Sequence, residues 1–209
     1  RLRLVRAFKN RFGAVNEVGV FVMTDSGLRS VENPSSMLLS SDKTAKPGSV
    51  VLVAQEGTRP LLVELQALVD DTVLAAPRRL SIGLDGGRIN MLLAVLNKHA
   101  GIALGNKEIY VNVAGGIKLS ETATDVAIVL AVLSSYFDKP LPVGAVCFGE
   151  IGLSGEIRPV QRGQERLKEA KKLGFTRALI PHANQASHGF KNLKIVPLKN
   201  ICELLEFFH

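Results

Sequence analysis

The sequence predicts an α/β protein of the α+β type, with a mixed β-sheet packed against helices. The run at 109–113 alternates apolar and polar residues, which is the period of a half-buried strand. The run at 126–133 is apolar on every side, which predicts a buried helix. A β-ribbon is expected at 145–159, between two helical segments. Because strands and helices do not alternate one by one, we expect a mixed sheet rather than a doubly wound parallel one.

A β-hairpin is expected in the first part of the chain. Residues 1–6 and 18–23 have strand patterns, and the turn-forming pentad Lys9-Asn10-Arg11-Phe12-Gly13 lies between them. The hairpin would hold Lys9 and Arg11 at its tip, about 7 Å apart along an extended chain. The strand pattern starts at the first residue, and there is no initiator Met. We therefore expect the chain to be a fragment of a larger protein.

Residues 49–208 are expected to form a second domain, after a polar linker. Ser120, Thr122 and Asp125 precede the apolar helix and predict a capped helix start, with Thr122 and Asp125 at capping-box spacing. The expected elements are strands at 50–54, 61–68 and 78–84, a helix at 90–100 that stops at Gly101, the strand at 109–113, the apolar helix, the ribbon, a helix at about 160–173, strands at 177–181 and 194–197, and a terminal helix at 200–208.

Composition limits the classes of function. The net charge of +7 is compatible with nucleic-acid binding but does not by itself indicate it. No apolar run approaches the length of a membrane span, and no signal-peptide pattern is present. Cys147 and Cys202 lie among apolar neighbours, which predicts buried, reduced thiols and a cytoplasmic protein. We expect no metal site, because His182 and His188 lack further ligands at suitable spacing.

The block at 110–174 resembles the proteolytic domain of the Lon family, a Ser–Lys peptidase fold. In that family the helix after a Gly-rich turn opens with Asp-Gly-Pro-Ser-Ala-Gly, whose Ser is the nucleophile. Residues 120–125 occupy those places, and the nucleophile position is Ala123. The general-base Lys follows a Gly-Glu-Ile ribbon, and its position is Gln164. A methyl group cannot attack a carbonyl, and a carboxamide cannot take a proton near neutral pH, so the resemblance implies a peptidase frame without its chemistry.

The pentad at 9–13 resembles the signature of RadA-type bacterial DNA repair ATPases, which carry a RecA-like motor followed by a Lon-like domain. The resemblance continues through Glu32-Asn33-Pro34-Ser35 and Glu56-Gly57-Thr58-Arg59-Pro60. It implies that residues 1–48 are the end of a RecA-like ATPase core and its linker, and that 49–208 are an inactive Lon-like domain.

This resemblance implies the C-terminal part of an ATP-dependent DNA motor that migrates branches of recombination intermediates, alongside a RecA-type recombinase. Lys9 and Arg11 would reach ATP in the adjacent subunit and stabilise the charge that develops in phosphoryl transfer. Action on a neighbour implies an oligomer, expected to be a hexamer. ATP and Mg²⁺ would be bound elsewhere, because these residues contain no Gly-x-x-x-x-Gly-Lys-Ser/Thr loop. A purely structural turn at the pentad is the alternative.

Contacts with DNA, single-stranded or branched, are expected from basic residues of the second domain. Arg162 and Arg166 are four residues apart in a predicted helix, a like-charge pair that costs stability in isolation and indicates an anionic partner. Lys118 lies beside Gly115-Gly116, where backbone amides can also approach a phosphate. Few aromatic residues favour salt-dependent contacts with the nucleic-acid backbone. The predicted DNA-contacting residues are Arg78, Arg79, Arg88, Lys118, Arg158, Arg162 and Arg166.

Two other classes of function stay open. One is a peptidase with a displaced dyad, which would pair Ser120 with Lys118 or Ser154 with Lys168. Ser120 is better explained as a helix cap and Ser154 as a turn residue, so we do not favour this dyad. The other is an oligomerisation module that has no affinity for DNA.

Overall fold

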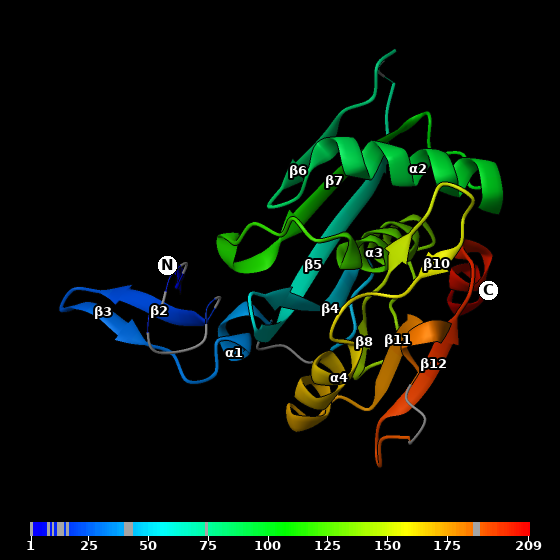
Figure 1. Ribbon diagram of the computed structural model, residues 1–209. Coiled ribbons are helices and arrows are strands. Elements are labelled where there is room, and N and C mark those ends of the chain that lie inside the picture. The colour runs from blue at the N-terminus through cyan, green and yellow to red at the C-terminus, as the bar shows by residue number, and fades with distance from the viewer. Residues whose placement is uncertain are drawn as a thin grey trace.

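A seven-stranded mixed sheet and a smaller three-stranded antiparallel sheet organise the protein (Figure 1). A computed structural model describes residues 2–7, 9, 11, 15, 17–39, 44–73, 75–185 and 189–209. Helices pack against the larger sheet, while the smaller sheet projects from the main body. The predicted α/β class with a mixed sheet is therefore confirmed.

The smaller sheet contains the predicted hairpin. Strand β1 (Leu2–Arg6) pairs antiparallel with β2 (Val18–Thr24), and the structure adds a third strand, β3 (Gly27–Ser30), beside β2. Strand β3 was not expected from the sequence. It begins two residues after β2, at Gly27, whose φ of 102° suits glycine. Of the pentad, Lys9 and Arg11 belong to the described residues, and the other three lie outside them.

The larger sheet has the strand order β12-β11-β8-β4-β5-β7-β6. Strands β4 and β7 flank β5 as antiparallel neighbours, and the remaining pairs, from β4 outward to β12 and between β7 and β6, are parallel. The strands are β4 (Ser49–Glu56), β5 (Arg59–Asp71), β6 (Arg79–Ile82), β7 (Lys107–Val113), β8 (Ala145–Cys147), β11 (Arg177–Pro181) and β12 (Lys194–Leu198). A separate two-stranded ribbon joins β9 (Glu150–Ile151) to β10 (Ile157–Arg158).

Helix α3 (Asp125–Tyr136) forms the centre of the core. Every residue from 125 to 134 is buried, which confirms the apolar run as a buried helix. The predicted capping box is wrong, because the Thr122 hydroxyl donates to Glu150 at 2.7 Å and the Asp125 carboxylate binds other groups. The cap residue is Thr124, which makes no side-chain hydrogen bond to the helix N–H groups. Ser120 is exposed and does not cap this helix either.

Two further helices flank α3. Helix α2 (Gly86–Ala100) begins where the Asp85 carboxylate accepts from the Arg88 N–H at 2.7 Å, and it ends at Gly101 in a left-handed conformation, as predicted. Helix α4 (Gly163–Lys172) follows the β9–β10 ribbon. The short 3₁₀ helices are η1 (Ala114–Gly116), η2 (Thr122–Thr124), η3 (His182–Asn184) and η4 (Ile201–Phe207).

The segment expected to be a linker contributes to the core. Helix α1 (Ser35–Leu38) packs on β5, with the side chains of Ser35 and Leu38 buried. The Ser35 hydroxyl accepts from the Leu62 N–H at 3.1 Å, and the Arg59 guanidinium donates to the Glu32 carbonyl at 2.9 Å. The start of this segment is thus fixed to the larger sheet, while the division at residues 48 and 49 stays a prediction.

The two cysteines have different surroundings. Cys147 is buried in β8, and burial raises the pKa of its thiol. Cys202 is exposed, so the prediction of burial is wrong for this residue; η4 buries Ile201 and Leu204 instead. Both thiols are free. Across the described ranges, the helices are too short or too polar to cross a membrane.

Candidate functional site

The position that would hold a peptidase nucleophile is occupied by a buried methyl group. Ala123 lies in η2, directly before α3, and its side chain is 2% exposed. Its carbonyl accepts from the Gly149 N–H at 2.9 Å, and the Gly149 carbonyl accepts from the Val126 N–H at 3.1 Å. A Cβ at Gly149 would lie 2.8 Å from Val126 Cγ2, so this close approach requires glycine. The turn is well packed but offers no nucleophile.

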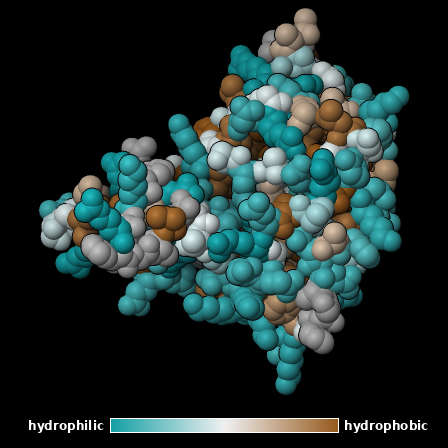
Figure 2. Space-filling model, in the orientation of Figure 1, coloured by the Kyte–Doolittle hydropathy of each residue, from teal (hydrophilic) through white to brown (hydrophobic). Residues whose placement is uncertain are grey.

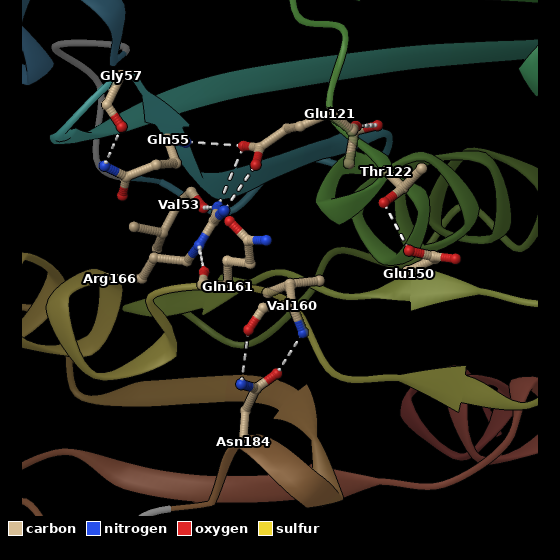
Figure 3. A network of polar contacts seen from close by, with 11 residues as sticks. Val53, Gln55, Gly57, Glu121, Thr122, Glu150, Val160, Gln161, Arg166 and Asn184 are labelled. Carbon is tan, nitrogen blue, oxygen red and sulfur yellow. Dashed lines mark hydrogen bonds and ion pairs between the residues drawn. The ribbon is translucent and has the colours of Figure 1, made fainter. Parts of the chain in front are cut away.

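The position that would hold the general base is fixed by amide contacts. Gln164 lies in the first turn of α4, and its Nε2 donates to the Asn184 carbonyl at 3.2 Å. The Asn184 amide in turn exchanges two hydrogen bonds with the Val160 backbone, each 2.9 Å long (Figure 3). Gln164 therefore anchors α4 to η3 and has no group that accepts a proton near neutral pH.

A buried ion pair connects the two altered positions. Arg166 of α4 is 2% exposed, and its guanidinium donates to both carboxylate oxygens of Glu121, which precedes η2, at 3.1 and 2.6 Å (Figure 3). It also donates to the Val53 carbonyl at 2.7 Å and the Gln161 carbonyl at 3.1 Å. Glu121 accepts a further bond from the Gln55 N–H at 2.7 Å. The pair thus joins α4, β4 and the entry to α3.

The burial of Arg166 corrects the prediction that this residue contacts DNA. Arg162, by contrast, is exposed at the start of α4 with a φ of 57°, so the two arginines do not share a solvent-facing surface. The interpretation of a like-charge pair that needs an anion is wrong, because Glu121 neutralises Arg166. The spacing of Gly163, Arg166, Leu167 and Ala170 could have placed Arg166 on the buried face of the helix.

A second ion pair lies at the start of α3. The Arg88 guanidinium from α2 donates to both oxygens of Asp125, through Nε at 2.9 Å and through Nη2, and also to the Ile151 carbonyl at 3.2 Å. The Ile151 N–H donates to Asp125 at 2.9 Å. Burial raises the pKa of the Asp125 carboxyl, and the bonds from Arg88 and Ile151 oppose that shift; the bond to Asp125 raises the pKa of Arg88. Arg88 thus makes a structural contact while its side chain is 26% exposed, and its assignment to DNA stays a prediction.

The remaining predicted DNA contacts are exposed but do not form one group. Arg158 on β10 is 58% exposed and lies 4.0 Å from Glu150, and Arg162 follows it along the chain. Lys118 follows η1 on another part of the surface. Arg78 and Arg79 are at the edge strand β6, where Arg79 donates to Asn90 at 3.4 Å. Hydrophilic residues cover the region of α4 in Figure 2.

The displaced peptidase dyads are not assembled. Ser120 and Lys118 are both exposed, and so are Ser154 and Lys168. Ser154 lies in the β9–β10 turn, where its N–H donates to Glu156 at 3.1 Å. Within the described part of the chain, neither serine hydroxyl is hydrogen-bonded to its lysine. Lys9 and Arg11 are exposed beyond the end of β1.

Comparison with known proteins identifies the family. The chain is 51% identical over 205 residues to DNA repair protein RadA of Haemophilus influenzae, which is 98% of this chain. It is 53% identical over 206 residues to the protein of the same name from Pseudomonas aeruginosa, which is 99% of this chain. It is 51% identical over 208 of its 209 residues to that of Escherichia coli. The chain belongs to the RadA family. It spans 45% or 46% of the length of these relatives.

A family model described as subunit ChlI of Mg-chelatase matches residues 88–184. That range runs from the start of α2 to the end of η3 and includes both ion pairs and both altered peptidase positions. The residues matched by this family model therefore lie within the part of the chain that is also similar to the RadA relatives.

Removing Arg166 is expected to destabilise the fold. Arg166→Met removes the guanidinium that pairs with the Glu121 carboxylate, so the free energy of unfolding should fall by about 3 kcal/mol. Urea denaturation measures this loss. Lys168→Met is the matched control, because Lys168 is exposed on the same helix, and it should change stability by less than about 0.5 kcal/mol.

The double variant Arg166→Met with Glu121→Gln should recover part of the loss, because it removes the unpaired charge. Equal stability of Arg166→Met and Lys168→Met would show that the ion pair does not hold these elements together.

Proposed function

We propose that this chain is the C-terminal portion of an ATP-dependent DNA motor that acts in recombinational repair and migrates branches of recombination intermediates. The observation that carries the proposal is the identity of 51–53% along nearly the whole chain to relatives named DNA repair protein RadA. Since the chain spans less than half of those relatives, the motor activity would depend on residues outside this sequence. The expected partners are DNA and a RecA-type recombinase, in the cytoplasm.

The larger domain would serve as a Lon-like scaffold without proteolysis. The methyl group of Ala123 and the carboxamide of Gln164 support this part, because neither can perform nucleophilic or base catalysis. The Glu121–Arg166 pair supports it as well, since it fixes the surrounding elements in place without any reactive group. A domain that keeps its shape without chemistry can still assemble subunits and bind a polyanion.

DNA would be held by exposed cations rather than by stacking. Arg158 and Arg162 are the strongest candidates, because they are exposed and adjacent to the solvent-facing side of α4. That helix adds Lys168, Lys171 and Lys172, which are exposed as well. Contacts of this kind neutralise phosphates and release counterions, so binding should weaken steeply with salt.

The hairpin would contribute to ATP turnover in a neighbouring subunit. Lys9 and Arg11 are exposed, and neither has an acidic partner among the described residues. An Arg fork and a Lys ammonium can both stabilise negative charge on a transferred phosphoryl group. ATP and Mg²⁺ would be bound by the part of the longer protein that carries a phosphate loop, and a ring, expected to be a hexamer, would bring the hairpin to that site.

Charge reversal tests the DNA contact. Arg158→Glu with Arg162→Glu should weaken binding to single-stranded DNA at least tenfold at 100 mM salt and reduce the slope of log K against log salt by about 0.7 per lost phosphate contact. Fluorescence anisotropy of a labelled oligonucleotide measures both quantities. Arg29→Glu with Lys191→Glu is a charge-matched control, because both residues are exposed, with Arg29 on β3 and Lys191 before β12, and it should retain most of the affinity.

An unchanged slope after reversal at 158 and 162 would contradict these contacts. Absence of DNA binding by the wild-type chain at low salt would favour the oligomerisation module.

Mixing of subunits tests the hairpin. In the protein that carries its ATPase core, Arg11→Ala should lower ATP turnover by about 10³, which is the usual contribution of an arginine finger. Mixing this variant with subunits whose phosphate-loop Lys is removed should restore part of the turnover, because an intact hairpin then meets an intact site. ATPase activity measured against mixing ratio shows the effect, and a mixture as inactive as its components would exclude action between subunits.

A further inference from the structure

Two sequence motifs that the proposed function does not use are in contact with each other. One is the segment Glu32-Asn33-Pro34-Ser35, and the other is the turn Glu56-Gly57-Thr58-Arg59-Pro60 between β4 and β5. The Arg59 guanidinium donates through Nη2 to the Glu32 carbonyl at 2.9 Å. The Leu62 N–H of β5 donates to the buried Ser35 hydroxyl at 3.1 Å. The motifs therefore fix two segments that are 27 residues apart in the chain.

This contact lies where the chain leaves the smaller sheet. Val31 follows β3 directly, and its N–H donates to the Val20 carbonyl of β2 at 2.8 Å. The hydrogen bonds of the smaller sheet thus continue to the residue before Glu32. Helix α1 comes next and lies between the smaller and the larger sheet (Figure 1). A bond to the Glu32 carbonyl therefore holds the smaller sheet at its exit.

The same turn is also close to the strand that enters the hairpin. Glu56 ends β4 and is paired with Arg59, which begins β5. Burial raises the pKa of the Glu56 carboxyl, Glu121 raises it further, and the Arg6 cation lowers it. Arg6 is the last residue of β1 and precedes Lys9 by three positions. The turn is thus near the smaller sheet on the side of β1 as well as at its exit.

Apolar packing accompanies these polar contacts. Val20 of β2 is 2% exposed, and Leu2 of β1 packs against the buried core. A Cβ at Gly115 of η1 would collide with Leu38 of α1 and would lie 3.9 Å from Leu2 Cδ1. Apolar contacts of this kind have no preferred direction, whereas a hydrogen bond depends on the positions of its donor and acceptor. Orientation of the smaller sheet on the larger domain therefore falls to the polar contacts.

The turn is tied to α4 through the ion pair. The Gln55 N–H, one residue before Glu56, donates to Glu121 at 2.7 Å, and Glu121 accepts from Arg166 of α4 (Figure 3). One end of β4 is thus bonded to α4 and lies beside the residue that holds the smaller sheet. The position of the hairpin is therefore set by the same elements that carry the exposed cations of α4.

We propose that Arg59 is a positioning residue for ATP turnover. It orients the smaller sheet on the larger domain, so that Lys9 and Arg11 meet the ATP of the adjacent subunit at a fixed position. A guanidinium suits this task, because its donors form a rigid planar fork and its charge is permanent. Arg59 acts through the Glu32 carbonyl and not by contact with the nucleotide. The inference rests on the proposed function, in which the hairpin assists ATP turnover.

Kinetics of a variant without the guanidinium test this role. In the protein that carries its ATPase core, Arg59→Met should lower kcat for ATP about tenfold, because a displaced catalytic group loses much of its effect. The KM for ATP should not change, since Arg59 does not bind the nucleotide. Arg59→Lys keeps a cationic donor and should recover part of the turnover. Arg177→Met is the matched control, because Arg177 is partly buried in β11, which β4 and β8 separate from β5, and it should keep the wild-type kcat.

Hydrogen exchange of the same proteins measures the contact itself. The amides of β1 and β2 should exchange faster in Arg59→Met than in the wild type, while exchange in α3 should be unchanged because the core is intact. Unchanged exchange in β1 and β2 would overturn the proposal. A raised KM for ATP, or weakened DNA binding with unchanged kcat, would show a direct contact of Arg59 with the ligand and would overturn it as well.

Arg11→Ala, measured in parallel, separates this inference from the proposed function. If Arg11→Ala lowers turnover and Arg59→Met does not, the positioning role fails and the role of the hairpin stands. If Arg11→Ala keeps the wild-type turnover, the role of the hairpin in ATP turnover fails, whatever exchange in β1 and β2 shows.

Discussion

The ion pair between the buried Arg166 and the partly buried Glu121 is the interaction on which the arrangement around the larger sheet depends. Removing a guanidinium and a carboxylate from water costs several kcal/mol for each ion, so such a pair persists only where its hydrogen bonds are well satisfied. Here the Val53 and Gln161 carbonyls complete the bonds of Arg166, and the Gln55 N–H completes those of Glu121. The contact joins a strand, a helix and the entry to the central helix, and therefore fixes their mutual positions.

In the proposed Lon-like domain, this pair would hold the frame together without a reactive centre. The elements that would carry a nucleophile and a base are held together by Glu121 and Arg166 and, at the start of α3, by Asp125 and Arg88. In each pair both carboxylate oxygens accept hydrogen bonds from the arginine. The surface left for function is peripheral: cations near β10 and α4.

Local patterns predicted most of the secondary structure. The apolar run of α3, the stop at Gly101 and the hairpin between β1 and β2 each depend on residues close in sequence. The site depends on long-range contacts: Arg166 lies 45 residues from Glu121, and Arg88 lies 37 residues from Asp125. No local pattern shows that a cation has such a partner, so both arginines were assigned to DNA. The helical spacing of Arg166 relative to the apolar residues of α4 did indicate that its side chain is buried.

We propose that this domain keeps a peptidase-like arrangement and has lost its chemistry. Incubation of the folded chain with a fluorophosphonate probe, followed by mass spectrometry, tests it most directly. The account predicts no modified serine beyond the level found in heat-unfolded protein, in the presence or absence of an unfolded protein substrate. Specific labelling of Ser120 or Ser154, lost when Lys118 or Lys168 is replaced by Met, would contradict it.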